Sequence, residues 1–150
     1  MKKEITVLVA RSLLFLLFIY ASVSKLVNIP QFKGQMFKQP FPHWMGYALM
    51  VIIPVAEIVV AVSLFFDKSA RKALMGSIIL MVLFTGYIIA ILSNAFGRIP
   101  CSCGGIIEKF NWSQHLIFNF LFLSIAILGF VLIKNKKREA NSNFRNIVVS

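Results

Sequence analysis

Four long apolar runs constrain the fold of this chain more than any other feature of its sequence. They cover about residues 5–27, 44–66, 74–96 and 113–133. Each run has the roughly 20 residues that a helix needs to cross a hydrocarbon core about 30 Å thick. They lack the alternation of apolar and polar residues that marks the strands of membrane barrels, so helices must satisfy their backbone groups. The sequence predicts an all-α membrane protein, a four-helix transmembrane bundle over residues 1–133.

Composition and charge agree with a membrane protein. Of the 150 residues, 59% are hydrophobic and 14% are charged, which is too apolar for a soluble domain of this size. The net charge of +11 would suggest nucleic acid as the partner of a soluble protein. Here the basic residues gather beside the apolar runs, where they bear on orientation in a membrane. We therefore expect the lipid bilayer, and no nucleic acid, as a partner.

The distribution of lysine and arginine predicts how the bundle is oriented. With the amino terminus inside, the inner segments hold ten basic residues and the outer segments hold five. The positive-inside rule then makes both termini cytoplasmic, with residues 134–150 as a basic cytoplasmic tail. The predicted location is the bacterial inner membrane, crossed four times.

A cleaved signal peptide is a rival interpretation of the first run. Lys2 and Lys3 would be its basic region, residues 13–19 its apolar core, and residues 21–23 resemble a cleavage site. Arg11 leaves that apolar core short, which favours a spanning helix.

Two charged residues, Arg11 and Glu57, lie deep within the predicted spans. At 1.5 Å per residue, Arg11 lies about 9 Å and Glu57 about 13 Å from the inner ends of their spans. Unpaired charges at this depth cost several kcal/mol, so we expect an Arg11–Glu57 ion pair, either structural or involved in proton movement. Lys25, near the outer end of the first span, is expected to extend to the headgroups.

The segment between the first two runs predicts a short outer helix. Phe32, Met36 and Phe37 recur at helical spacing between Pro30 and the proline-rich residues 40–42. A short amphipathic helix lying on the membrane fits this pattern.

The two cysteines of the chain, Cys101 and Cys103, are separated by one residue in the outer segment after the third run. Disulfides can form outside the cytoplasm. A bridge across one residue is strained, and strain makes a disulfide easier to reduce. Pro100 would stiffen the entrance to such a turn, and Gly104 and Gly105 would supply its unusual backbone angles. The pair therefore predicts a reversible disulfide.

Two other uses of the cysteines stay open. Two thiolates with His43 or His115 are ligand types that suit Cu(I) or Zn. One Cys-x-Cys pair is an incomplete ligand set, however, so no metal ligand is assigned. A purely structural disulfide would close almost no loop and stabilise little, and two idle thiols are the remaining alternative.

The start of the fourth run adds two candidate residues. Asn111 and Gln114 have the spacing of a helix cap, which puts His115 in the first turn. His115 and Asn119 are four residues apart and share a helix face near the cysteines. His115 is a candidate proton relay to a leaving thiolate, besides the simpler role of an interfacial residue satisfied by water. Asn119 suits hydrogen bonding between helices.

These residues, in this order, resemble the MauE branch of the DoxX-like membrane proteins. The similarity runs from about residue 11 to residue 133 and rests on short motifs. In chain order they are Arg11, Lys25, Pro54-Val-Ala-Glu57, Cys101-Ser-Cys103-Gly104, His115 and Asn119.

The resemblance implies a four-helix membrane bundle associated with thiol redox chemistry. In MauE that chemistry serves the maturation of a disulfide-rich periplasmic enzyme. By matching position, Cys101 and Cys103 would be the redox pair, and Arg11 and Glu57 the family's intramembrane polar residues. MauE proteins often have an aromatic residue after the second cysteine, where this chain has Gly104. That difference bears on the partner protein more than on the chemistry.

The leading hypothesis from the sequence is a periplasm-facing thiol–disulfide redox protein, and thus a candidate oxidoreductase. Its expected partner is a thioredoxin-like or disulfide-rich periplasmic protein. Quinone in the bilayer is a candidate electron acceptor, with the polar interior around Arg11 and Glu57 as its site, although the sequence contains no quinone motif. The alternatives are a non-catalytic assembly or scaffold subunit and a copper-handling protein.

Overall fold

The structure is a computed structural model that describes residues 2–37, 42–93 and 112–149. Within these ranges the chain forms five helices and no strand. They are α1 (Lys2–Val27), α2 (Ile29–Phe37), α3 (His43–Phe65), α4 (Ala70–Leu92) and α5 (Trp112–Val149). Four stretches of the described chain are long and apolar enough to cross a membrane: Lys3–Val27, His43–Phe65, Ala70–Ala90 and Ser113–Asn135. The predicted all-α bundle with four spanning helices is confirmed.

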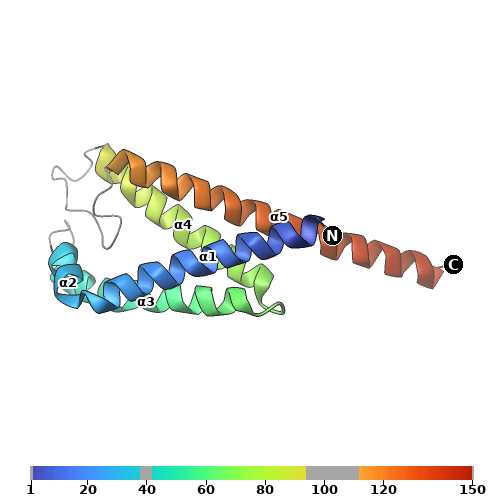
Figure 1. The fold of residues 1–150 in the computed structure, drawn as a ribbon, viewed down its shortest axis with the longest axis horizontal. Helices are drawn as coiled ribbons and strands as arrows, with labels where there is room; N and C mark the ends of the chain where they lie inside the picture. Colours follow the sequence, from blue (N-terminus) through green and yellow to red (C-terminus); the bar gives the residue numbers. More distant parts are fainter. Residues whose placement is uncertain (1, 38–41, 94–111, 150) are drawn as a thin grey trace.

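The four spanning helices form a ring in which consecutive spans are antiparallel. α1 packs against α3 and α5, and α4 packs against the same two helices from the other side. Figure 1 shows α2, the start of α3, the end of α4 and the start of α5 at one end of the bundle, which we call the α2 end. The start of α1 and the connection between α3 and α4 lie at the opposite end, which we call the turn end. The cytoplasmic placement of the turn end stays a prediction from the charge distribution.

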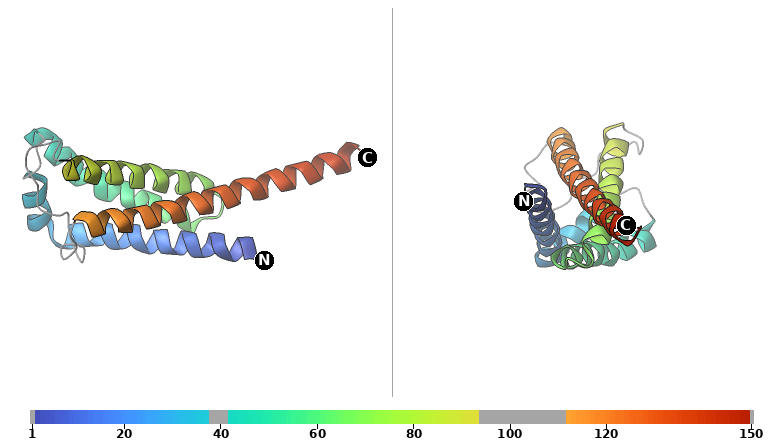
Figure 2. Two further views of the ribbon diagram at one scale, coloured as in Figure 1. Left: turned by 90° about the horizontal axis from the view of Figure 1, so that it is seen from above. Right: turned by 90° about the vertical axis from the view of Figure 1, so that its right-hand side faces the viewer.

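The last helix extends beyond the membrane span that the sequence predicted. The predicted span over residues 113–133 agrees with the apolar stretch Ser113–Asn135. The helix itself, α5, continues through 38 residues to Val149, so residues 134–149 of the predicted tail are helical, and this final part projects beyond the other helices (Figures 1 and 2). Residues 130–149 contain neither glycine nor proline, the two residues that interrupt helices most strongly, so the backbone continues as a helix past the apolar run.

The short helix predicted between the first two spans is confirmed as α2. Phe32 and Met36, four residues apart, are both buried, as expected for one face of a helix. Phe37 packs edge-on against Tyr47 of α3, with 4.8 Å between the ring centroids. α2 is therefore folded against the start of α3, and its predicted position on the membrane surface stays a prediction.

The outside and the inside of the bundle differ as a bilayer requires. Large apolar side chains such as Leu16, Val51, Leu83 and Ile117 are exposed on the outside, where lipid can cover them. Among the side chains that the structure describes, the buried polar ones are Ser22, Glu57, Ser77, Thr85 and Asn119. Polar groups within membrane spans commonly face the bundle interior. The chain is a multi-pass membrane protein.

Small residues let the helices approach closely in the half of the bundle nearer the turn end. A Cβ atom added to Gly76 would lie 3.1 Å from a methyl group of Val60 on α3. One added to Gly129 would lie 3.4 Å from the Cβ atom of Ala10 on α1. Close approach through small residues is the usual packing device of membrane helices, and it makes this half compact.

Candidate functional site

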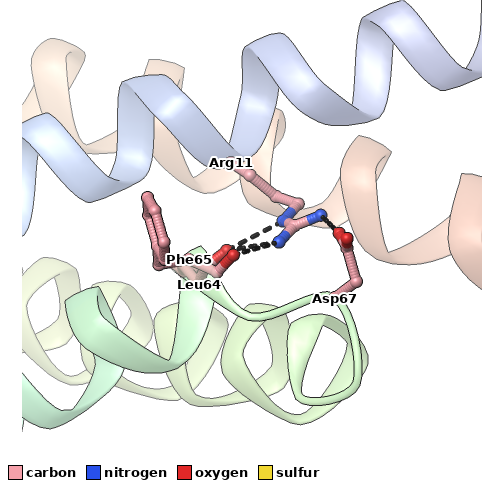
Figure 3. Close-up of polar contacts among 4 residues, drawn as sticks. All are labelled: Arg11, Leu64, Phe65 and Asp67. Atoms are coloured by element: carbon pink, nitrogen blue, oxygen red, sulfur yellow. Dashed lines mark hydrogen bonds and ion pairs between the residues drawn. The ribbon is translucent and has the colours of Figure 1, made fainter.

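Arg11 caps the carboxyl end of α3 at the turn end of the bundle. Its Nε and Nη2 atoms donate to the carbonyl of Leu64 at 2.9 and 2.6 Å, and Nη2 also donates to the carbonyl of Phe65 at 3.1 Å. Nη1 donates to the carboxylate of Asp67, as Figure 3 shows. The last carbonyls of a helix lack partners within it and carry partial negative charge. Arg11 therefore has a structural role that its own contacts explain.

The predicted Arg11–Glu57 ion pair is wrong, because Glu57 is paired with Lys25. The Nζ atom of Lys25 lies 2.8 Å from Oε1 and 3.1 Å from Oε2 of Glu57. The side chain of Glu57 is only 2% exposed and that of Lys25 only 11%. The expectation that Lys25 extends to the headgroups is wrong as well.

The direction of side chains on a helix explains both corrections. Each Cα–Cβ bond tilts toward the amino terminus of its helix. Arg11 therefore leans toward the start of α1, away from Glu57 and onto the last carbonyls of α3. Lys25 leans in the same direction, into the bundle, as its hydrogen bond to the carbonyl of Ala21 at 3.2 Å shows. Glu57 belongs to the antiparallel helix and leans the opposite way, so it meets Lys25.

The Lys25–Glu57 pair is saturated and fixed between two helices. The ammonium group has three donors, and it bonds the carbonyl of Ala21 and both oxygens of Glu57. Nearby, the hydroxyl of Ser22 donates to the carbonyl of Pro54 at 3.3 Å. These contacts link the part of α1 nearer the α2 end to the middle of α3, and the ammonium group has no remaining donor for a further partner.

A cavity of about 400 Å³ lies in the half of the bundle nearer the α2 end. Figure 1 shows α4 and α5 diverging from α1 and α3 toward this end. All five helices contribute to the lining, and most of the side chains are apolar. The aromatic members are Phe18, Tyr20, Phe32, Phe84, Tyr87 and Phe118. The volume is in the range of sites for small organic molecules, roughly 300–1,000 Å³.

The charged and polar groups of the cavity come from three helices. Lys25 of α1, Glu57 of α3, and His115 and Asn119 of α5 all line it. Lys25 and His115 therefore belong to the walls of one cavity although they come from different helices. The structure thus brings together three of the sequence-predicted residues, Glu57, His115 and Asn119, and leaves Arg11 outside the lining.

Asn119 is the unusual member of this group. It is 4% exposed, and among the buried side-chain nitrogen and oxygen atoms of the described residues only its Nδ2 lacks a hydrogen-bond partner. An unsatisfied buried donor costs about 1–3 kcal/mol. The hydrogen bonding between helices expected for Asn119 does not involve this nitrogen, which borders a cavity instead.

The cysteine motif lies outside the described residues, and so do the loop residues predicted with it. These are Pro100, Cys101, Cys103, Gly104 and Gly105. The chain that carries them joins Leu92 to Trp112, two helix ends at the α2 end of the bundle (Figure 1). In the part of the chain that the structure describes, no group of three or more His, Cys, Asp or Glu could hold a metal ion. Since the cysteines lie outside that part, the copper alternative is not tested.

Sequence reasoning missed Lys25 as a partner of Glu57, although a signal for it exists. Arg11, Phe18 and Lys25 are spaced seven residues apart, so both cations occupy one stripe of α1. Glu57 and Leu64, also seven apart, share a stripe of α3. In an antiparallel pair of helices with these two stripes facing each other, Arg11 meets the end of α3 and Lys25 is left for Glu57.

Comparison with known proteins gives one match. The family model described as "Methylamine utilisation protein MauE" matches residues 3–132. No curated protein sequence and no solved structure matches the chain. The matched range contains every residue of the cavity lining.

Proposed function

Because the chain belongs to the MauE family of membrane proteins, we propose that it is a thiol–disulfide redox protein of the bacterial inner membrane. Cys101 and Cys103 alternate between a disulfide and two thiols in this proposal. Their partner is a thioredoxin-like or disulfide-rich protein outside the cytoplasm, where disulfides persist.

One observation carries the proposal. The cavity, with Lys25, Glu57, His115 and Asn119 in its lining, lies in the half of the bundle nearer the end where α4 ends and α5 begins (Figure 1). Those two helix ends bracket the segment with both cysteines of the chain. Reactive cysteines usually have basic groups nearby, because these favour the thiolate form of the cysteine. His115 lies in the first turn of α5. It is the first ionisable residue of the helix that follows the cysteine segment.

The exchange follows ordinary thiol–disulfide chemistry. A thiolate of the partner attacks one sulfur of the Cys101–Cys103 disulfide and forms a mixed disulfide, while the other sulfur leaves as a thiolate. His115 acts as the proton donor to that leaving thiolate. The second thiolate of the partner then breaks the mixed disulfide. Two electrons and two protons pass to the cysteine pair, and the partner becomes a disulfide.

Trapping the mixed disulfide tests the proposal. In Cys101→Ala or Cys103→Ala variants, the remaining cysteine should accumulate a disulfide-linked adduct with a partner, because the internal thiol that would release it is missing. Nonreducing electrophoresis of membranes from intact cells, followed by mass spectrometry, measures the adduct. The double variant Cys101→Ala/Cys103→Ala should show none.

Two outcomes would count against the proposal. A scaffold subunit would give no adduct with either single variant and would lose nothing when both cysteines are replaced. A membrane-impermeant thiol reagent should label the reduced cysteines in intact cells, since the positive-inside rule puts the α2 end outside. Labelling that requires permeabilised cells would contradict the proposed orientation.

A further inference from the structure

We infer that the cavity at the α2 end binds a neutral, membrane-soluble carbonyl compound of the quinone class, with Asn119 donating a hydrogen bond to its carbonyl oxygen. The inference rests on the proposed function and extends it: a quinone bound in the cavity would receive the electrons of the cysteine pair.

The lining of the cavity suits a flat ring with an apolar tail. Six aromatic side chains take part in it, from all of the helices except α3. Aromatic side chains pack favourably on other rings in stacked or edge-on arrangements. Aliphatic side chains such as Leu49, Ile52 and Leu80 supply the remaining apolar wall. The volume of about 400 Å³ fits a ring with the beginning of a tail.

Asn119 supplies the polar contact that selects a carbonyl. Its Nδ2 atom is a donor and lacks a partner, so it needs an acceptor rather than another donor. Because the residue is 4% exposed and borders the cavity, an acceptor can reach it only from inside that cavity. Quinone oxygens are acceptors, whereas a pure hydrocarbon offers none.

The charges in the lining favour a neutral ligand. Lys25 and Glu57 neutralise each other at 2.8 Å, and the three donors of the ammonium group are already used by Ala21 and Glu57. The phosphate of a phospholipid would need a cation with free hydrogen-bond donors. Lys25 cannot serve, because its donors are already used. A quinone needs no counter-charge and satisfies the one open donor.

The redox balance agrees with a quinone as acceptor. Oxidation of two thiols to a disulfide releases two electrons and two protons, and reduction of a quinone to a quinol takes up the same number. The proposed cycle thus closes with the partner's dithiol oxidised to a disulfide, the quinone reduced to a quinol, and the cysteine pair returned to its starting disulfide.

Direct binding tests the inference without any redox assay. The full-length protein in detergent micelles is titrated with decylubiquinone, and binding is measured by calorimetry and by the rise in melting temperature. We expect saturable binding at one site. Asn119→Leu should weaken it at least about tenfold, equivalent to roughly 1.4 kcal/mol, because leucine has a similar size and no donor.

Two further variants separate a local effect from a damaged fold. Ala56→Phe places a ring into the cavity from α3, where Ala56 lines it, and should abolish binding while Asn119 stays intact. Ser124→Ala is the matched control on α5: its exposed hydroxyl bonds only the carbonyl of Phe120 on its own helix, and binding should stay unchanged. Wild-type protein that does not bind decylubiquinone, or Asn119→Leu and Ala56→Phe proteins that bind it normally, would overturn the inference.

Decylbenzene distinguishes a quinone site from a nonspecific apolar pocket. It has the same tail and no carbonyl, so it should bind more weakly than decylubiquinone and be insensitive to Asn119→Leu. Equal binding of the two probes by the wild-type protein would show that the cavity accepts any apolar molecule and does not select a carbonyl, which would overturn the inference.

Replacing the cysteines separates this inference from the proposed function. The Cys101→Ser/Cys103→Ser double variant should bind decylubiquinone as the wild type does. Binding without any trapped adduct would contradict the thiol chemistry and leave the quinone site standing. A trapped adduct in a protein that does not bind decylubiquinone would contradict the quinone site and leave the thiol chemistry standing.

Discussion

The two basic residues of α1 that face the bundle interior serve opposite ends of it in different ways. Arg11 binds backbone carbonyls of α3 and the 92%-exposed carboxylate of Asp67. Lys25 binds a carboxylate that is almost fully buried. Around Arg11 the helices are tightly packed through small residues, whereas Lys25 stands beside a cavity. The turn end is thus organised for stability, and the α2 end keeps space and polar groups that the fold alone does not require.

The largest expected effect comes from breaking the Lys25–Glu57 pair on one side. Lys25→Met or Glu57→Leu leaves an uncompensated charge in the bundle interior, which costs about 3–5 kcal/mol. Thermal unfolding in detergent measures the loss. The double variant Lys25→Met/Glu57→Leu should recover most of it, because a buried pair replaced by apolar residues is often neutral.

Lys68→Met provides the control for this prediction. Lys68 is an exposed lysine in the connection between α3 and α4, so its loss should change stability by less than about 0.5 kcal/mol. Equal melting temperatures for wild type, Lys25→Met and Lys68→Met would show that the pair is not a buried ion pair.

A smaller effect is expected at the turn end. Arg11→Met removes the donors to the carbonyls of Leu64 and Phe65 and should cost about 2–3 kcal/mol, the scale of a charged hydrogen bond. Arg11→Lys should recover part of this, since an ammonium group lacks the planar fork that serves both carbonyls. Thermal unfolding in the same detergent gives both values.

Asp67→Asn tests which contact of Arg11 matters. Exposed ion pairs contribute about 0–1 kcal/mol, so this variant should resemble the wild type. A loss as large as that of Arg11→Met would mean that the carboxylate, rather than the carbonyls of α3, explains the position of Arg11.

The smallest effect compares two glycines of α4. Gly86 has nothing within 4 Å of an added Cβ atom, so Gly86→Ala should stabilise the helix by up to about 1 kcal/mol. Gly76→Ala should gain less, because the added methyl group meets Val60 at 3.1 Å. Parallel unfolding curves measure the difference, and a larger gain at Gly76 would contradict the close packing of α3 and α4.

Much of this fold could be predicted from the sequence because a bilayer restricts the choices. The apolar runs predicted the four spans, and the spacing of Phe32, Met36 and Phe37 predicted α2. The end of α5 could not be predicted from hydropathy, since a helix ends where its backbone partners end and not where apolar residues stop.

The candidate site was harder to predict for a geometric reason. Depth estimates put Arg11 and Glu57 at similar levels, but depth says nothing about which way a side chain leans. The tilt of side chains toward each helix's amino terminus decides that Lys25 and not Arg11 meets Glu57. The cavity depends on the angles between helices, which no residue pattern specifies. His115 and Asn119 share a helix face as predicted, and both line that cavity.

The pairing of Lys25 with Glu57 also determines how the protein responds to an energised membrane. A potential of 100 mV acts on a single charge that crosses the bilayer with about 2.3 kcal/mol. An ammonium and a carboxylate 2.8 Å apart carry no net charge as a unit, so moving the pair as a whole along the membrane normal carries almost no charge through the field. The voltage across the membrane therefore does little work on a joint movement of the two helices.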